Sequence, residues 1–240
     1  MGPWDLPPAW FDQLAPGGTL VVPLHWRGQA RSIAFTRHDT HLRAENSQLC
    51  GFIPMIGIVP TGEQTGTVTK DVALYWDADQ NIDAAELQDV FSGPEITIWS
   101  GVFVVANEPF DHIWLWLTAT EPGTCRIDAE DQAIEAGVCR PAFAYRTPTI
   151  VEGESLAYLT KPRPADQPGP HGERRYELGA TGHGPAAARL AERIVSQIRR
   201  FDRDRSAQPI ITSYPADRAE ETRPAGIVID KSHVRLVITS

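Results

Sequence analysis

One glycine-rich stretch in this sequence has residue types that could bind an anion. It runs from Gly179 to Gly184, between a predicted strand and a helix that Pro185 would open. Backbone amides at a helix N-terminus favour phosphate or carboxylate groups. The spacing differs from that of a dinucleotide-binding turn, and no acidic residue follows at the distance needed to bind a ribose. A plain connection is therefore the favoured interpretation, and an anion site is the alternative.

A second stretch, Asp77 to Asp83, begins like a calcium-binding loop because oxygen-bearing side chains alternate along it. Ile82 stands where such a loop needs glycine for its turn, and Gln88 stands where it needs a bidentate carboxylate. The pattern indicates a solvated loop that ends in a helix cap at Asp83.

The histidines and cysteines do not predict a metal site. His38 and His41 are three positions apart and Cys125 and Cys139 are fourteen apart, so neither set supplies four ligands at zinc spacing. A polar hairpin turn and buried free thiols explain them better. With Cys50 the count is odd, which favours a reducing, cytoplasmic compartment.

Catalytic residues cannot be assigned from the sequence. Ser100 precedes Gly101 but lacks the G-x-S-x-G frame of a hydrolase nucleophile. The tryptophans Trp99, Trp114 and Trp116 could form an aromatic surface for a peptide, but tryptophans at helical spacing are more often core residues.

The first elements of the chain predict a buried sheet. Pro7 and Pro8 suit the start of a helix, and the glycines after Pro16 end it. The apolar strand from Thr19 to Leu24 is of the kind that is buried on both faces of a parallel sheet. Its neighbours would precede it, so the chain looks as if it opens in the middle of an α/β domain.

The rest of the chain predicts a mixture of strands and helices. A hairpin turn at residues 38–40 joins strands at 31–37 and 41–45, and a boundary falls between residues 57 and 58. Further strands are expected at 68–76, 96–106, 141–145, 155–159, 174–178, 210–214 and 226–238, helices after Asp83, Asn107 and Pro185, and an exposed loop at 160–172.

The helix, the Pro-Gly-Gly turn and the apolar strand resemble the segment up to the fifth strand of protein-L-isoaspartate O-methyltransferases. Ser32–Arg37, Leu42–Glu45 and the ending Phe52-Ile53-Pro54-Met55 extend the resemblance from Pro3 to about Gly57. The later region with Trp99 and Trp114 is similar to the C-terminal part of variants encoded beside lanthipeptide and other ribosomal-peptide clusters.

The resemblance implies an α/β fragment for residues 1–57, the end of a Rossmann-like methyltransferase sheet. An α+β accessory domain, for substrate or partner binding, would follow at residues 58–240. The complete enzyme would use S-adenosylmethionine to methylate an aspartate or isoaspartate carboxylate of a protein or ribosomal peptide. The family's donor-binding half precedes the matching segment. No cofactor-binding residue is therefore carried over, and the chain alone is expected to bind no donor and to be inactive.

One part of the family's site can be carried over. Gly2-Pro3-Trp4-Asp5 matches the segment that lies near the methyl donor and the acceptor peptide in that family, so Pro3 and Trp4 are candidates for lining a substrate site. The alternative is that Trp4 only covers the start of the helix.

Charge and hydropathy limit the partners. A net charge of −9 argues against binding to nucleic acid, which depends on lysine and arginine. No apolar run approaches the ~18 residues of a membrane span. A second function is consistent with the sequence: a non-catalytic module that binds a peptide or docks on a separate, donor-binding methyltransferase chain, because an open sheet edge needs a partner.

Overall fold

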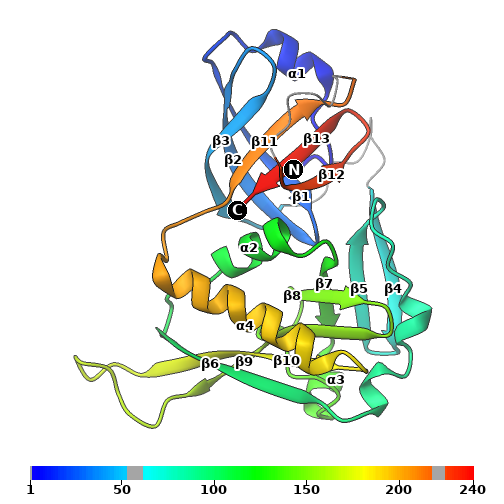
Figure 1. Ribbon diagram of the computed structural model, residues 1–240, viewed down its shortest axis with the longest axis vertical. Coiled ribbons are helices and arrows are strands. Elements are labelled where there is room, and N and C mark those ends of the chain that lie inside the picture. Colours follow the sequence, from blue (N-terminus) through cyan, green and yellow to red (C-terminus); the bar gives the residue numbers. More distant parts are fainter. Residues whose placement is uncertain (1, 53–61, 218–224) are drawn as a thin grey trace.

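The computed structural model describes residues 2–52, 62–217 and 225–240. These residues form two sheets, one in the upper and one in the lower half of the molecule, with helix α2 between them (Figure 1). All pairings between the described strands are antiparallel. The protein is therefore mostly β, with few helices, and the Rossmann-like fragment that we expected is not confirmed.

The upper sheet has six strands in the order β1-β2-β3-β11-β13-β12. It combines strands from both sides of the expected boundary at 57/58. Their bounds are β1 (Thr19–Trp26), β2 (Gln29–Arg37), β3 (Leu42–Leu49), β11 (Ile210–Pro215), β12 (Ile227–Asp230) and β13 (Val234–Thr239), and α1 (Pro8–Gln13) precedes them. The helix at Pro8 and the hairpin around residues 38–40 are confirmed.

The prediction that the first strand is buried on both faces of a parallel sheet is wrong. Among the described strands, β1 lies at the edge of its sheet and pairs antiparallel with β2 alone. Val21 is 66% exposed, whereas Val22 and Leu24 are buried. This alternation is typical of an antiparallel strand that has only one covered face, which a short apolar run cannot reveal.

The lower sheet has seven strands in the order β4-β5-β7-β8-β9-β10-β6. Their bounds are β4 (Glu63–Thr69), β5 (Val72–Asp77), β6 (Ile96–Val105), β7 (Thr124–Ala129), β8 (Thr147–Glu152), β9 (Ser155–Pro164) and β10 (Arg175–His183). The single strand predicted at 68–76 is in fact the β4–β5 hairpin. α3 (Asp131–Glu135) is one short turn between β7 and β8.

Helix α4 (Ala187–Arg203) packs on β6, β9 and β10. It confirms the amphipathic helix predicted after Pro185, because Leu190, Ile194, Val195 and Ile198 are buried against the sheet. Arg200 and Arg203 lie in its last turn, where cations interact favourably with the helix dipole.

The predicted glycine-rich loop is not a loop. Strand β10 continues through Gly179 and Gly182 to His183. A Cβ atom at Gly182 would overlap the carbonyl oxygen of Ala187, so this glycine allows the strand to pack closely on the start of α4.

Three smaller predictions in the lower half also change. The exposed loop predicted at 160–172 is in part strand, because β9 runs to Pro164. The strand predicted at 141–145 is a single bridge between Pro141 and Thr160. The helix predicted after Asp83 is a pair of 3₁₀ turns, η1 (Ala84–Leu87) and η2 (Val90–Ser92). Asp83 does cap η1, since its side chain accepts a hydrogen bond from Ala85 N at 2.8 Å.

Helix α2 (His112–Thr120) connects the two cores. Leu115 and Trp116 belong to the core of the upper sheet, while Ile113 and Leu117 belong to the core under α4. A helix that is apolar all around is buried on all sides, and α2 lies between the two halves for this reason. No helix among the described residues combines the length and apolar character needed to cross a membrane.

Candidate functional site

Charged side chains gather where the β1–β2 hairpin meets the lower sheet. The hairpin turn consists of Arg27 and Gly28, which both have positive φ angles, 49° and 75°. Two-residue turns of this kind favour glycine and asparagine, so an arginine there is unusual. A Cβ atom at Gly28 would overlap Arg126, which places this turn directly against β7.

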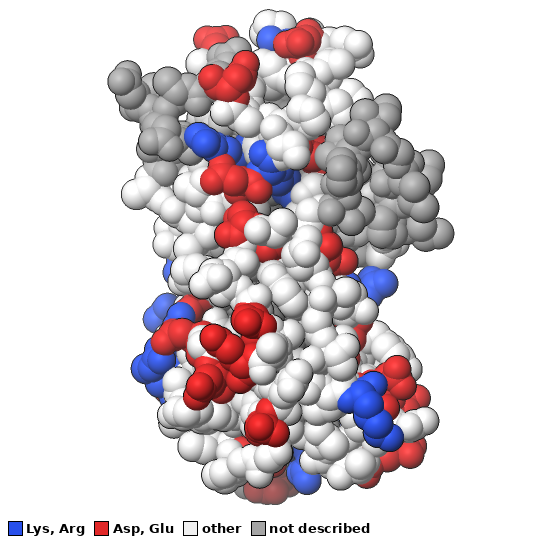
Figure 2. All heavy atoms as spheres, turned by 90° about the vertical axis from the view of Figure 1, so that its right-hand side faces the viewer, with Lys and Arg blue, Asp and Glu red and all other residues white. Residues whose placement is uncertain are grey.

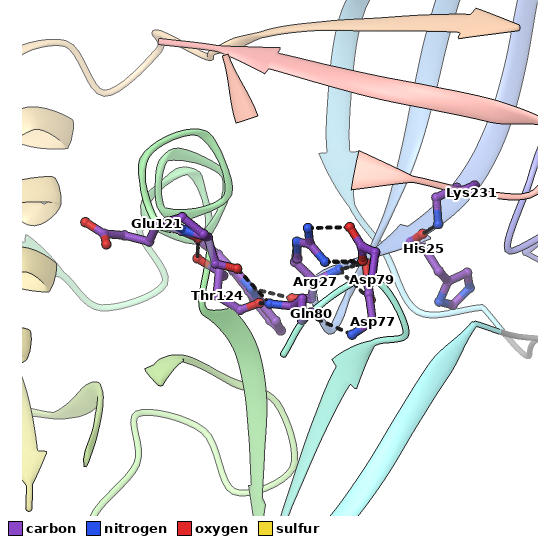
Figure 3. Close-up of polar contacts among 10 residues, drawn as sticks. His25, Arg27, Asp77, Asp79, Gln80, Glu121, Thr124 and Lys231 are labelled. Atoms are coloured by element: carbon purple, nitrogen blue, oxygen red, sulfur yellow. Dashed lines mark hydrogen bonds and ion pairs between the residues drawn. The ribbon is translucent and has the colours of Figure 1, made fainter. Parts of the chain in front are cut away.

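Arg27 binds two aspartates, Asp77 at the end of β5 and Asp79 two residues further along the chain (Figure 3). Its backbone N–H donates to both carboxylate oxygens of Asp77, at 3.0 and 2.9 Å. Its guanidinium donates to the two oxygens of Asp79, at 2.6 and 2.8 Å. Burial raises the pKa of Asp77 to about 6, although Lys231 and Arg27 act in the opposite direction.

Two further side chains fix this cluster to its surroundings. Gln80 accepts a hydrogen bond from Asp77 N at 2.8 Å and donates to the carbonyls of Pro122 and Thr124. The indole of Trp114 in α2 donates to the carbonyl of Arg27 at 3.3 Å. The residues that resembled a calcium loop are therefore used to connect the two sheets. Within residues 2–52, 62–217 and 225–240, no group of three His, Cys, Asp or Glu side chains is placed to hold a metal ion.

On the upper side of the cluster lies a buried lysine. Lys231, in the β12–β13 turn, is 8% exposed and donates to the carbonyl of His25 at 2.8 Å. Burial lowers the pKa of Lys231 to about 8, against the attraction of Asp77 and Asp5. Burial and the charge of Lys231 lower the pKa of His25 to about 4. At neutral pH the lysine therefore carries the charge and the histidine is neutral.

Of the two residues predicted to line a substrate site, Trp4 lies beside Lys231. Pro3 is buried and Trp4 is half-buried. The Lys231 ammonium lies 3.5 Å from the centre of the Trp4 ring, a cation–π contact. Trp4 thus contacts one cation of the charged cluster. That these two residues line a substrate site stays a prediction.

A groove of about 650 Å³ opens beside the Arg27–Asp79 pair. We call it the junction groove. One wall is β12, the second is the segment from Asp79 to Glu86, and the third is formed by the turns at Gly123 and Gly153 with Arg193 of α4. On the side that carries β4 and β5, acidic side chains gather in the lower half and basic ones lie toward its edges (Figure 2).

The other residues that we considered from the sequence lie in buried, hydrogen-bonded or stacked positions outside the charged cluster. Ser100 is buried and donates to the carbonyl of Leu178 at 2.7 Å. Trp114 and Trp116 are buried core residues, and Trp99 lies under the guanidinium of Arg163. His38 and His41 stack on each other at the hairpin turn, and Cys125 and Cys139 are buried free thiols.

Sequence reasoning missed Arg27 and Lys231, the two cations of the cluster. The unusual arginine before Gly28, in a turn between two apolar strands, was a usable signal for the first. Nothing in the local sequence marks Lys231, because its burial depends on strands that are distant in the chain.

The glycine-rich stretch that we considered as an anion site does not fit S-adenosylmethionine. The only glycine-rich approach to a helix among the described residues is β10, and there Gly182 and Gly184 are in close contact with the backbone of Ala187 and Glu154. This packing leaves no space for a donor molecule at the start of α4.

Comparisons with known proteins give one result. No curated protein and no solved structure matches the chain. A family model does match, over residues 2–59, which is about a quarter of the 240 residues. It covers α1, β1, β2 and β3, the same stretch in which we found the resemblance. Residues 2–59 are thus similar to the family described as protein-L-isoaspartate(D-aspartate) O-methyltransferase.

Proposed function

We propose that this chain is the C-terminal part of a methyltransferase similar to the protein-L-isoaspartate O-methyltransferases. The complete enzyme would transfer a methyl group from S-adenosylmethionine to an aspartate or isoaspartate carboxylate of a protein or ribosomal peptide. The observation that carries this proposal is the family-model match over residues 2–59. The remaining residues would serve substrate or partner binding.

The edge of the upper sheet supports the idea that a donor-binding unit is added to this chain. Among the described strands β1 pairs only with β2, and Val21 on β1 is largely exposed. An exposed edge strand offers unpaired backbone groups to another strand. In our proposal the donor-binding unit pairs with β1, and this chain alone does not transfer methyl groups.

The test begins with isothermal titration of the purified chain with S-adenosylmethionine. We expect no binding at micromolar donor, and micromolar binding would contradict the assignment of donor binding to another unit. The chain is then co-expressed with a small methyltransferase subunit, and transfer of labelled methyl groups to an isoaspartyl peptide is measured. We expect co-purification and transfer that exceeds that of either component alone.

A pair of variants makes the test specific. Val21→Arg places a charge on the β1 edge and should abolish co-purification. Val228→Arg places the same charge on an exposed valine of β12, at the other end of the sheet, and should leave it intact. Equal effects of both variants would exclude β1 as the docking edge.

The second candidate function is a non-catalytic module that binds a peptide or docks on a separate methyltransferase chain. The junction groove supports this second function, because a peptide could bind in the groove without any methyl donor being bound to the chain. Co-purification without any gain in methyl transfer would favour this function over the first.

A further inference from the structure

The junction groove has a strand edge as one of its walls. β12 is the last strand of the upper sheet and pairs only with β13 among the described strands. Its residues Ile227, Val228 and Asp230, and Gly226 just before it, line the groove. The backbone groups on the unpaired side of an edge strand can form hydrogen bonds with an added strand. The groove is therefore suited to a ligand with an extended peptide backbone.

The charges of the groove indicate which peptide it would take. Five carboxylates line it, Asp79, Asp83, Glu86, Glu152 and Asp230, but only two cations, Arg27 and Arg193. Arg27 binds Asp79 bidentately, Arg193 and Arg189 both donate to Glu152, and Arg235 from outside the groove donates to Asp230. Two carboxylates, Asp83 and Glu86, therefore have no cationic partner among the described residues, and a cationic ligand would balance them.

These two carboxylates differ in how strongly they are already bound. Asp83 caps η1. Glu86 is exposed, and the described residues offer its carboxylate no partner. It lies on the wall formed by residues 79–86, so it is the group most available to a basic side chain.

The buried Arg27 forms a rigid part of the groove. The side chain of Arg27 is 4% exposed, and its Nε has no hydrogen-bond partner among the described residues. Because its guanidinium is held by Asp79, the acidic wall keeps its position relative to β1 and β2. A site whose polar groups are already held in place loses less conformational entropy when it binds.

We propose that the junction groove binds an extended peptide that pairs with the edge of β12 on which no described strand lies, and that places a lysine or arginine side chain near Glu86. This proposal rests on the proposed function in one respect: we take the peptide to be part of the methyl-acceptor substrate, at a distance from the modified carboxylate. The groove would then select acceptors by a basic residue near the methylation site.

The test measures direct binding to the full chain by fluorescence anisotropy, with no methyl donor present. The probe is a short fluorescein-labelled peptide in which lysine and threonine alternate. Two control peptides carry either glutamate in place of lysine or N-methyl groups on alternate amides, which removes the backbone donors. We expect binding of the lysine peptide alone. Equal binding of either control peptide would overturn the proposal.

Matched variants locate the site. Glu86→Lys should weaken binding of the lysine peptide by about threefold to tenfold, as expected for the loss and reversal of one exposed charge pair. Glu135→Lys makes the same change on an exposed carboxylate outside the groove and should leave binding unchanged. An equal loss in both variants would mean that only net charge matters, and the groove assignment would fail.

The two proposals can fail separately. If the lysine peptide binds as expected but the co-expressed preparation transfers no methyl groups, the peptide-binding proposal stands and the methyltransferase assignment is wrong. If methyl groups are transferred but the peptide does not bind through the strand edge, the methyltransferase assignment stands and the peptide-binding proposal is wrong.

Discussion

Asp77 and Lys231 are buried ionisable groups that both stay charged near pH 7, at a cost in stability. The pKa of Asp77 is raised to about 6 from an ordinary value of 3.8, so between these pH values the folded state holds more protons and stability falls as the pH rises. The pKa of Lys231 is lowered to about 8 from 10.5, so between pH 8 and 10.5 the unfolded chain holds more protons and stability rises with pH.

Replacing the lysine should remove the second of these effects. In Lys231→Met the rise above pH 8 disappears, so the difference in free energy of unfolding between wild type and variant should increase by on the order of 3 kcal/mol between pH 8 and 10.5. Urea denaturation at both pH values measures it. We compare wild type with variant at each pH because the raised pKa values of Cys125 and Cys139 make both proteins less stable as the pH rises through the same range. This contribution cancels in the difference between the two proteins.

The control for this measurement is Lys161→Met, since Lys161 is exposed on β9. The difference in free energy of unfolding between wild type and Lys161→Met should not change between pH 8 and 10.5. A flat difference for Lys231→Met as well would mean that Lys231 is hydrated in the folded protein.

A second residue-scale prediction concerns the buried arginine beside α2. Arg31 is fully buried, and its guanidinium donates to Asp111 at 2.6 Å. Asp111→Ala leaves this cation without its counter-charge and should cost about 3 kcal/mol of stability. Glu192→Ala, which breaks the exposed Arg199 pair on α4, should cost less than about 1 kcal/mol. Chemical denaturation measures both, and equal small losses would contradict the buried pair.

At the scale of elements, the glycines of β10 explain why a strand could be mistaken for a loop. Gly182→Ala should destabilise the protein by about 1–3 kcal/mol, because the new methyl group meets the backbone of Ala187 at the start of α4. Gly93→Ala is the control, since nothing lies near its Cβ position and its φ of −88° suits alanine. Thermal denaturation of the two variants tests this, and a neutral Gly182→Ala would show that α4 can shift.

Elements with local signals were predicted from the sequence, and those that depend on tertiary packing were not. The proline start of α1, the hairpin after β2 and the amphipathic face of α4 are all local patterns. The partners of β1 are not, because an apolar run of three residues fits a parallel core strand and an antiparallel edge strand equally well. The glycines of β10 gave a loop signal that close packing on α4 overrides.

At the scale of the whole molecule, the candidate site could not be predicted, because it joins distant parts of the chain. Arg27, Asp77 and Lys231 come from a hairpin turn, the end of a lower strand and a turn near the C-terminus. Asp77 and Lys231 are ordinary surface residues in their local sequence, and of the three only Arg27, in the turn before Gly28, has a local signal. Their burial follows from the contact between the two sheets, for which a single sequence has no local signal.

The same contact predicts how the molecule unfolds. β3 pairs with β11, and α2 contributes Leu115 to the core of the upper sheet and Leu117 to the core under α4, so loss of α2 would open both of these cores. We therefore expect one cooperative transition, with the slowest amides of β2 and of β9 exchanging at the same free energy in native-state hydrogen exchange. Leu115→Ala should lower both values together by about 2–5 kcal/mol. If β2 alone lost protection, the boundary expected at 57/58 would separate two units that unfold independently.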